Sequence, residues 1–297
     1  MLKKLLTYPL SIFAIFTICA QQNMQHGTVI ASVSVHSNII NRDVKYSVYL
    51  PPDYFSAQRR YPVTYLLHGY TGCETDWVDF GEANRIADKL IHENAIPDMI
   101  IVMPDGRNDF YMNTFDGKVK YEDFFIKELI PHIDSSYQTR PVKDFRGISG
   151  LSMGGYGATL LAMKNPDIFG ASAALSAAYF TDDEMMQMPD KDFDDEFGGF
   201  FGMKLKGKAR LTEHWKKNSI LNLSETLPIE KIKSVRWYFD CGDDDFLFEG
   251  NALLHIALTK KKINHEFRMR DGAHSWTYWR TGLPDALKFI GDGFKRI

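Results

Sequence analysis

The sequence Gly150-Leu151-Ser152-Met153-Gly154 contains the residue types and spacing in this chain that best suit chemistry. A serine between two such glycines can form a nucleophile elbow, a strained turn that exposes the hydroxyl between a strand and a helix. The flanking sequence predicts that context, because 145–149 is typical of a short buried strand and 156–164 of a helix. We therefore expect Ser152 to be a nucleophile, with the amide of Met153 facing the developing oxyanion. A glycine-rich turn without chemistry is the alternative.

A serine nucleophile needs a base and an orienting acid. Two loops in the C-terminal third could supply them, and each follows a predicted strand directly. One loop holds the consecutive acids of 243–245, and the other holds His274, the best placed of nine histidines. Because an open parallel sheet carries its site at the carboxyl ends of its strands, we expect both loops to meet Ser152 there. The residues alone leave the choice among the three acids open.

Five motifs occur in an order that resembles the putative-esterase family of α/β-hydrolases. They are Leu66-Leu67-His68-Gly69-Tyr70, Tyr111-Met112-Asn113, Gly147 to Gly157, Cys241-Gly242-x-x-Asp245-Phe246-Leu247 and Gly272-Ala273-His274-Ser275-Trp276. That family includes feruloyl and acetylxylan esterases, tributyrin-type carboxylesterases, enterobactin esterases and mycolyltransferases, with S-formylglutathione hydrolases as more distant members. The resemblance runs from about Ser34 to the C-terminus and is weakest over 179–227.

The resemblance implies an α/β-hydrolase fold, in which a mostly parallel central sheet is flanked by helices. It also implies a cap insertion at about 179–227, after the sixth strand. The first half of this insertion is acidic and apolar, whereas its basic stretch 204–210 is typical of a solvated face. An inert surface insertion is the alternative.

The same resemblance assigns roles to individual residues. It selects Asp245 as the triad acid beside Ser152 and His274, and it makes the amide of Tyr70 the second oxyanion donor, with Met153 as the first. It also places Tyr111 and Asn113 near the mouth of the site. We expect these two residues and Trp276, which follows the catalytic histidine closely, to contact substrate.

The function implied is that of a serine carboxylesterase that works through an acyl-enzyme and needs no cofactor or metal. The resemblance favours feruloyl or acetyl esters of plant polysaccharide as substrates. Aromatic side chains of the cap, Phe200 and Phe201 among them, favour a flat aryl-acyl group over acetyl. A siderophore esterase of the enterobactin type and an acyltransferase are alternatives. A further alternative is not an enzyme: a catalytically silent relative that binds carbohydrate.

Strands and helices alternate along the chain, as expected if they position these loops. Alternating or continuous apolar patterns predict strands at 29–35, 44–50, 63–67, 99–103, 171–175, 235–241 and 264–269. Helical patterns predict helices at 83–94, 121–137 and 249–261. No linker interrupts this alternation, so the sequence predicts a single α/β domain over 21–297.

The N-terminal sequence predicts a secretory signal peptide over 1–20. Lys3 and Lys4 precede a short apolar stretch that ends at Ala20, too short to span a bilayer. We therefore expect a secreted or periplasmic protein that begins near Gln21. A lipidated Cys19, which would add a membrane anchor, and an uncleaved N-terminal anchor are the alternatives.

Charge and cysteine content limit the remaining possibilities. Removal of the two signal-peptide lysines leaves 33 basic and 38 acidic residues, a net charge of −5. This balance gives no reason to expect nucleic acid or an anionic membrane as a partner. Cys73 and Cys241 lack metal-ligand spacing, and the sequence leaves open whether they form a disulfide.

Overall fold

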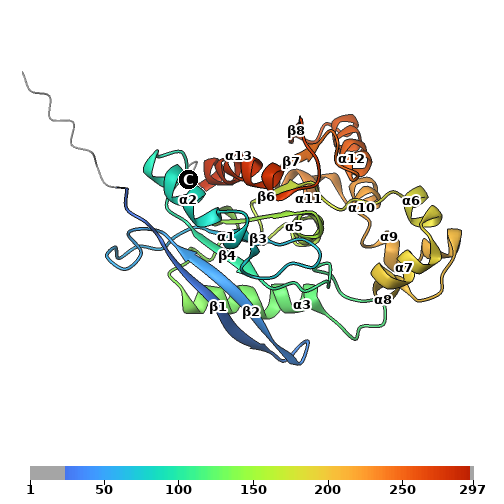
Figure 1. Cartoon of the computed structure of the whole chain (residues 1–297), viewed down its shortest axis with the longest axis horizontal. Helices are drawn as coiled ribbons and strands as arrows, with labels where there is room; N and C mark the ends of the chain where they lie inside the picture. Colours follow the sequence, from blue (N-terminus) through green and yellow to red (C-terminus); the bar gives the residue numbers. More distant parts are fainter. Residues whose placement is uncertain (1–23, 295–297) are drawn as a thin grey trace, which may run out of the picture.

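The computed structural model describes residues 24–294, so the expected signal peptide and Cys19 lie outside the described residues. Eight strands form one sheet in the order β1-β2-β4-β3-β5-β6-β7-β8 (Figure 1). β1 (Thr28–Ser37) and β2 (Arg42–Leu50) run antiparallel, and β2 pairs antiparallel with β4 (Ile100–Pro104). All later pairs are parallel, which confirms the predicted mostly parallel sheet.

The inner parallel strands are short and mostly apolar because helices cover both faces of the sheet there, whereas β8 at the edge is largely exposed. In β3 (Val63–Leu67), Val63 and Tyr65 face one core, whereas Leu66 faces the other. The remaining strands are β5 (Arg146–Leu151), β6 (Ala171–Leu175), β7 (Arg236–Gly242) and β8 (Glu266–Arg270). β5, which leads into Ser152, lies between β3 and β6 near the middle of the sheet.

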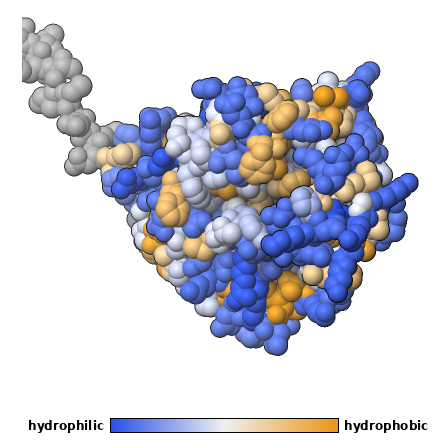
Figure 2. Space-filling view, turned by 45° about the vertical axis from the view of Figure 1, so that its right-hand side comes forward, coloured by the Kyte–Doolittle hydropathy of each residue, from blue (hydrophilic) through white to orange (hydrophobic). Residues whose placement is uncertain are grey.

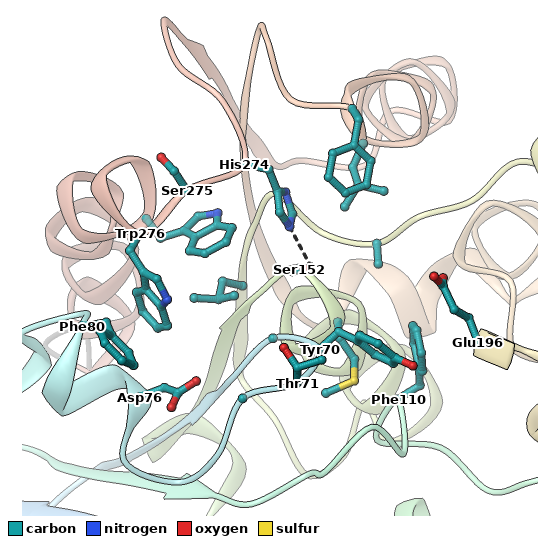
Figure 3. A pocket seen from close by; sticks show the side chains of 18 of the residues that line it. Tyr70, Thr71, Asp76, Phe80, Phe110, Ser152, Glu196, His274, Ser275 and Trp276 are labelled. Carbon is teal, nitrogen blue, oxygen red and sulfur yellow. Dashed lines mark hydrogen bonds between the residues drawn. The ribbon is translucent and has the colours of Figure 1, made fainter. Parts of the chain in front are cut away.

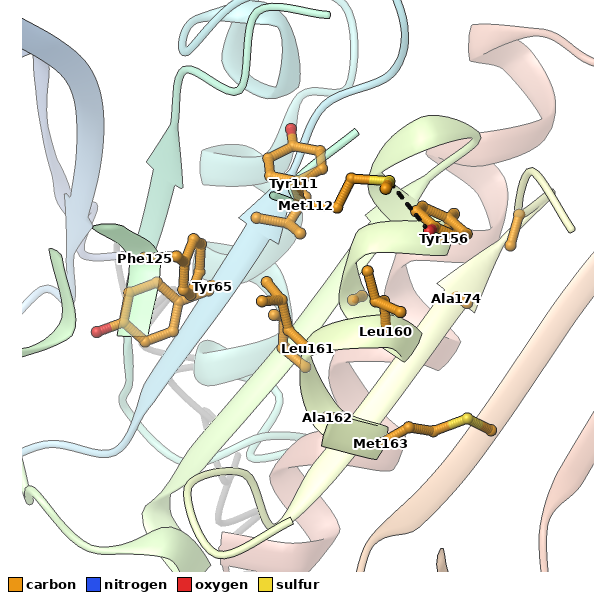
Figure 4. Close-up of a cluster of buried hydrophobic side chains, with 14 of the residues drawn as sticks. Tyr65, Tyr111, Met112, Phe125, Tyr156, Leu160, Leu161, Ala162, Met163 and Ala174 are labelled. Atoms are coloured by element: carbon orange, nitrogen blue, oxygen red, sulfur yellow. Dashed lines mark hydrogen bonds between the residues drawn. The ribbon is translucent and has the colours of Figure 1, made fainter. Parts of the chain in front are cut away.

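One face packs against a group of helices that surrounds α5 (Met153–Lys164). Figure 4 shows Leu160 and Leu161 of α5 lying between Tyr65 and Ala174 in this core. The other helical segments of this face are α3 (Tyr121–Phe124), the π-helical turn η1 (Phe125–Leu129), α4 (Ile130–Ser136) and α12 (Phe248–Lys260).

A second core lies on the opposite face of the sheet. Its helices are α1 (Asp76–Asp79), α2 (Ala83–His92) and α13 (Trp276–Phe294), and the short 3-10 turn η2 (Lys143–Phe145) adds Phe145. α13 begins two residues after His274, so the packing of this long helix fixes one end of the histidine loop.

The predicted cap is present between β6 and β7 as a series of short helices. They are α6 (Asp182–Gln187), α7 (Asp190–Glu196), α8 (Gly198–Phe201), the 3-10 turn η3 (Gly207–Arg210), α9 (Glu213–Lys216) and α10 (Ile220–Thr226), and α11 (Ile229–Lys233) follows. Arg210 departs from the expected solvated face, since it is 1% exposed. Its guanidinium donates to the carbonyls of Leu205, Met185 and Met188 and pairs with Asp190.

The surface of the described chain mixes polar and apolar residues. Figure 2 shows small apolar groups separated by hydrophilic side chains on the face in view. Within residues 24–294, no helix combines the length and apolarity that crossing a membrane would require. Cys73 and Cys241 are both free thiols, so the structure contains no bridge between them.

Candidate active site

Ser152 occupies a strained turn between β5 and α5. Its φ of 53° and ψ of −120° lie outside the regions that non-glycine residues ordinarily adopt. Backbone hydrogen bonds hold this conformation: the Ser152 amide donates to the carbonyl of Leu175 at 2.9 Å. The Ser152 carbonyl accepts from the amides of Tyr156 and Ala178, both at 3.0 Å. The predicted strand, turn and helix are therefore present around this serine.

The two glycines of the motif are required because backbone segments approach them closely. A Cβ atom at Gly154 would lie 2.4 Å from the carbonyl oxygen of Leu67, and one at Gly150 would lie 2.5 Å from the backbone of Gly154. Either methyl group would push the start of α5 away from β3 or β5. This contact explains why the sequence needs glycine on both sides of Ser152.

His274 connects Ser152 to Asp245. Its Nε2 lies 3.0 Å from Ser152 Oγ (Figure 3). Its Nδ1 lies 2.9 Å and 3.0 Å from the two carboxylate oxygens of Asp245. The carboxylate is the acceptor at Nδ1, so Nδ1 carries the proton and Nε2 is free to accept from the serine hydroxyl. These three side chains come from three separate loops at the carboxyl ends of β5, β7 and β8.

Asp245 is kept ionised by its hydrogen bonds. Burial by itself would raise the pKa of this carboxyl group. Hydrogen bonds from His274 and from the amide of Leu247 outweigh burial, so the pKa of Asp245 lies below its ordinary value. The two neighbouring acids contact the histidine loop differently. Asp243 accepts from the amide of Gly272 at 3.0 Å, and Asp244 donates its own amide to the Gly272 carbonyl.

The loop at Tyr70 reaches the same point from β3. Within residues 24–294, the amides of Tyr70 and Met153 have no hydrogen-bond partner, and both residues border the cavity at Ser152. The loop is fixed through His68, whose Nε2 accepts from the amide of Gly106 at 2.8 Å. The amide of Thr71 donates to Asn108 Oδ1 at 2.7 Å. Two amides are therefore available on a rigid support beside the serine.

Tyr111 and Asn113 do not line this cavity, contrary to the expectation of substrate contact. Tyr111 is fully buried, and its hydroxyl donates to the carbonyl of His68 at 3.0 Å, so it supports the Tyr70 loop. The Asn113 side chain accepts from the amide of Asp123 instead. Phe110 lines the cavity in their place. Left-handed backbones at Phe110 and Tyr111 turn this loop, which no periodic pattern could have predicted.

The cavity above Ser152 has a volume of about 840 Å³ and two aromatic walls. Figure 3 shows Trp276, Phe80 and Asp76 on one side of Ser152, with Phe110 and Glu196 on the other. Trp276 therefore lies where substrate contact was expected. Leu151, Phe246, Leu247 and Ser275 line the cavity from recognised motifs, and Phe180, Glu196 and Phe197 line it from the predicted cap. No pattern in the sequence indicated Asp76, Phe80, Phe110 or Trp279, which also line it.

The cap contributes different phenylalanines from those expected. Phe180 and Phe197 line the cavity at Ser152, whereas Phe200 and Phe201 lie behind them. The space around that second pair is only about 10 Å³. On the same wall, burial and then the charges of Asp192 and Asp195 raise the pKa of the Glu196 carboxyl.

Three exposed carboxylates, those of Asp243, Asp244 and Asp271, come within 4.8 Å of one another beside the two loops. Carboxylates of this kind suit hard cations such as Ca²⁺, but exposed acidic groups are also common without a metal. None of the three residues lines the cavity at Ser152.

Residues 37–290 match the model of the putative esterase family. An endo-1,4-beta-xylanase/feruloyl esterase of Xylanibacter ruminicola is 36% identical over 173 residues, which are 56% of this chain but only 24% of that protein. An acetyl esterase of Caldicellulosiruptor saccharolyticus is 28% identical over 227 residues, or 76% of this chain and 82% of that protein. A solved structure of a ferulic acid esterase superposes with a TM-score of 0.79 at 30% identity, covering 91% of this chain and 99% of that one.

These matches agree with the mostly parallel sheet, and they confirm the predicted family and fold class. The chain belongs to the putative esterase family, a family of carboxylic ester hydrolases with the α/β-hydrolase fold.

Proposed function

We propose that the protein is an exported serine carboxylesterase whose catalytic triad is Ser152, His274 and Asp245. The observation that carries this proposal is the continuous contact from the Asp245 carboxylate through both nitrogens of His274 to the serine hydroxyl. A buried ionised acid, a neutral imidazole and a hydroxyl in this order are the parts that activate a serine for acyl transfer.

The reaction begins when His274 takes the Ser152 proton as Oγ attacks the ester carbonyl. Negative charge then develops on the carbonyl oxygen, where the amides of Met153 and Tyr70 donate hydrogen bonds to it. His274 next returns the proton to the leaving alkoxide, and the acyl group stays on Ser152. Water, activated by the same histidine, releases the acid. Asp245 stays ionised and stabilises the imidazolium that forms in each half-reaction.

The substrates we propose are feruloyl or acetyl esters of plant polysaccharide. Aromatic walls and a volume of about 840 Å³ support a bulky, flat acyl group, because a cinnamate would bury more apolar surface than acetyl. The names of the relatives, feruloyl esterase and acetyl esterase, support the same two acyl groups. Open space above Ser152 leaves room for a polysaccharide-linked alcohol.

A substrate panel tests this proposal. We expect methyl ferulate and feruloylated arabinoxylan fragments to give the highest kcat/KM, above acetylated xylan and p-nitrophenyl acetate. If acetylated xylan is cleaved faster than the feruloyl esters, the proposed acyl group is wrong but the polysaccharide substrate class remains. Cleavage of a catecholate siderophore ester in preference to all of them would replace the substrate class, and transfer to an added sugar acceptor would indicate an acyltransferase.

Two further measurements test the enzyme class and the export. A fluorophosphonate probe should label Ser152, whereas a silent carbohydrate-binding relative would remain unlabelled. Mass spectrometry of exported protein should find an N-terminus near Gln21. A lipid on Cys19 or an intact Met1 would contradict cleavage by a signal peptidase after Ala20.

A further inference from the structure

Asp240 carries a fully buried carboxylate that the proposed mechanism does not use. It lies in β7, five residues before Asp245. Three side chains donate to it: Arg270 through Nε at 2.9 Å, Tyr238 through its hydroxyl at 3.2 Å, and Tyr278 through its hydroxyl. A buried carboxylate is costly unless it is paired and hydrogen-bonded, and these three donors supply both.

Two of these donors flank the loop that carries His274. Arg270 is the last residue of β8, and Tyr278 lies in the first turn of α13. Arg270 also donates to the Tyr278 carbonyl at 3.4 Å and to Thr281 Oγ1 at 3.2 Å, and its guanidinium lies 4.1 Å from the centre of the Tyr278 ring. The segment 271–275 is therefore fixed at both ends to one carboxylate.

The same contacts join the histidine loop to the acid loop. The amide of Asp243 donates to the Arg270 carbonyl at 3.1 Å. A Cβ atom at Gly242 would lie 2.0 Å from the Gly272 carbonyl oxygen, so the two loops touch through their backbones. Gly282 leaves space for the ion pair, because a Cβ there would lie 2.6 Å from Arg270 Nη2.

None of Asp240, Arg270 and Tyr278 lines the cavity at Ser152. Buried ion pairs are often no more stabilising than apolar residues of the same volume, so stability alone does not explain this cluster. We infer that Asp240, held by Arg270 and Tyr278, is a positioning residue that keeps the His274 loop in register with the Asp245 loop. This inference rests on the triad proposed above.

The test compares two conservative variants of the full-length protein, Tyr278→Phe and Asp240→Asn. We expect the kcat for p-nitrophenyl acetate to fall, by about 100-fold for Asp240→Asn, since small displacements of a catalytic group cost that much, and by less for Tyr278→Phe. KM should change less than about twofold, because neither side chain meets substrate. Wild-type kcat in a folded Tyr278→Phe variant overturns the inference, even if its melting temperature is lower. Should Asp240→Asn fail to fold, Tyr278→Phe decides.

A matched control separates positioning from general stability. Arg146, at the opposite end of β5 from Ser152, is also buried and pairs with Asp134 at 2.7 Å. Arg146→Gln should lower the melting temperature and leave kcat unchanged at a temperature where the variant is folded. A similar loss of kcat in Arg146→Gln and Tyr278→Phe would show that the Asp240 cluster has no specific role.

A double variant identifies the residue through which the cluster acts. If its effect passes through His274, Tyr278→Phe should cause no further loss in a His274→Ala background, measured as residual hydrolysis of an activated ester. A further loss of more than about threefold overturns the inference. Failure of the triad itself would be seen separately, as activity retained in Ser152→Ala.

Discussion

The carboxyl edge of the sheet and the cap both border the same cavity, but different interactions hold them. At the sheet edge, backbone hydrogen bonds and glycines bring Ser152, Asp245 and His274 together, with no room for a single methyl group at Gly154 or Gly242. The cap wall of the cavity is held instead by packing between aromatic rings. The centre of the Phe197 ring lies 5.3 Å from that of Phe110 and 5.2 Å from that of Phe180.

This difference separates two kinds of control over the reaction. Backbone contacts fix positions closely, which suits the proton transfer that we propose between Ser152 Oγ and His274 Nε2, 3.0 Å apart. Packed rings define a shape that a few substitutions can change, which suits selection among acyl groups. Changes at the sheet edge should therefore reduce kcat for every ester, whereas changes in the cap should alter KM for some esters only.

Ser152→Ala should have the largest effect at the sheet edge. We expect a loss of about 10⁶ in kcat, because the variant has no nucleophile. Ser149→Ala in the same strand is the control, since the buried Ser149 hydroxyl has no hydrogen-bond partner among residues 24–294. The kcat of both variants is measured with p-nitrophenyl acetate. A Ser152→Ala variant that keeps a tenth of wild-type turnover would contradict the proposed mechanism.

Asp245→Asn should lower kcat by about 10⁴, because an amide no longer enforces the tautomer of His274. Asp243→Asn and Asp244→Asn should cost only a few-fold, since neither carboxylate contacts the imidazole. Steady-state rates of the three variants on one ester give the comparison. Equal losses at all three positions would show that the wrong acid has been chosen.

Phe197→Ala tests the cap. It should raise KM for methyl ferulate about tenfold more than KM for p-nitrophenyl acetate, because the larger acyl group loses more apolar contact. Phe201→Ala is the matched control: it should cost about 3–5 kcal/mol of stability through the cavity it leaves, without this selectivity. If both esters respond alike to Phe197→Ala, the cap does not contact the acyl group.

The smallest predicted effect concerns the support of the Tyr70 loop. Tyr111→Phe removes the hydrogen bond to the His68 carbonyl and should lower kcat a few-fold with KM unchanged. Asn113→Ala should alter neither constant, since its side chain meets Asp123 and not the cavity. A selective rise in KM for either variant would restore the original expectation that these residues contact substrate.

The sheet and the meeting of the three loops at its carboxyl edge could be predicted because strong local patterns encode them. Apolar runs predicted the central strands, and the order of the motifs predicted that the loops of Ser152 and His274 meet a loop of acids. The family resemblance was needed to select Asp245 among those acids.

The helix expected at 156–164 begins three residues earlier in the structure, at Met153. The glycines of its first turn have low helix propensity, so the sequence pattern did not include them. Close packing of Gly154 against the backbone of Leu67 overrides that low propensity. A local sequence pattern does not contain this tertiary contact.

The side chains around the cavity could not be predicted to the same extent. Phe197 and Phe201 have the same chemistry and lie four residues apart, yet only Phe197 reaches the cavity. In such short helices, contacts with residues distant in sequence determine which way each aromatic ring points. The π-helical turn η1 within the predicted helix 121–137 similarly has no signal in the apolar pattern.

The buried Arg210 has a consequence for how this protein could change over evolutionary time. Its partners, the carbonyls of Leu205, Met185 and Met188 and the Asp190 carboxylate, all belong to the insertion itself. Exchange of the whole insertion would therefore keep this buried charge paired, whereas loss of Asp190 alone would leave the guanidinium without its carboxylate. The Tyr156 hydroxyl of α5 donates to the Asn218 carbonyl of the insertion, so a replacement segment would also have to supply an acceptor at that point.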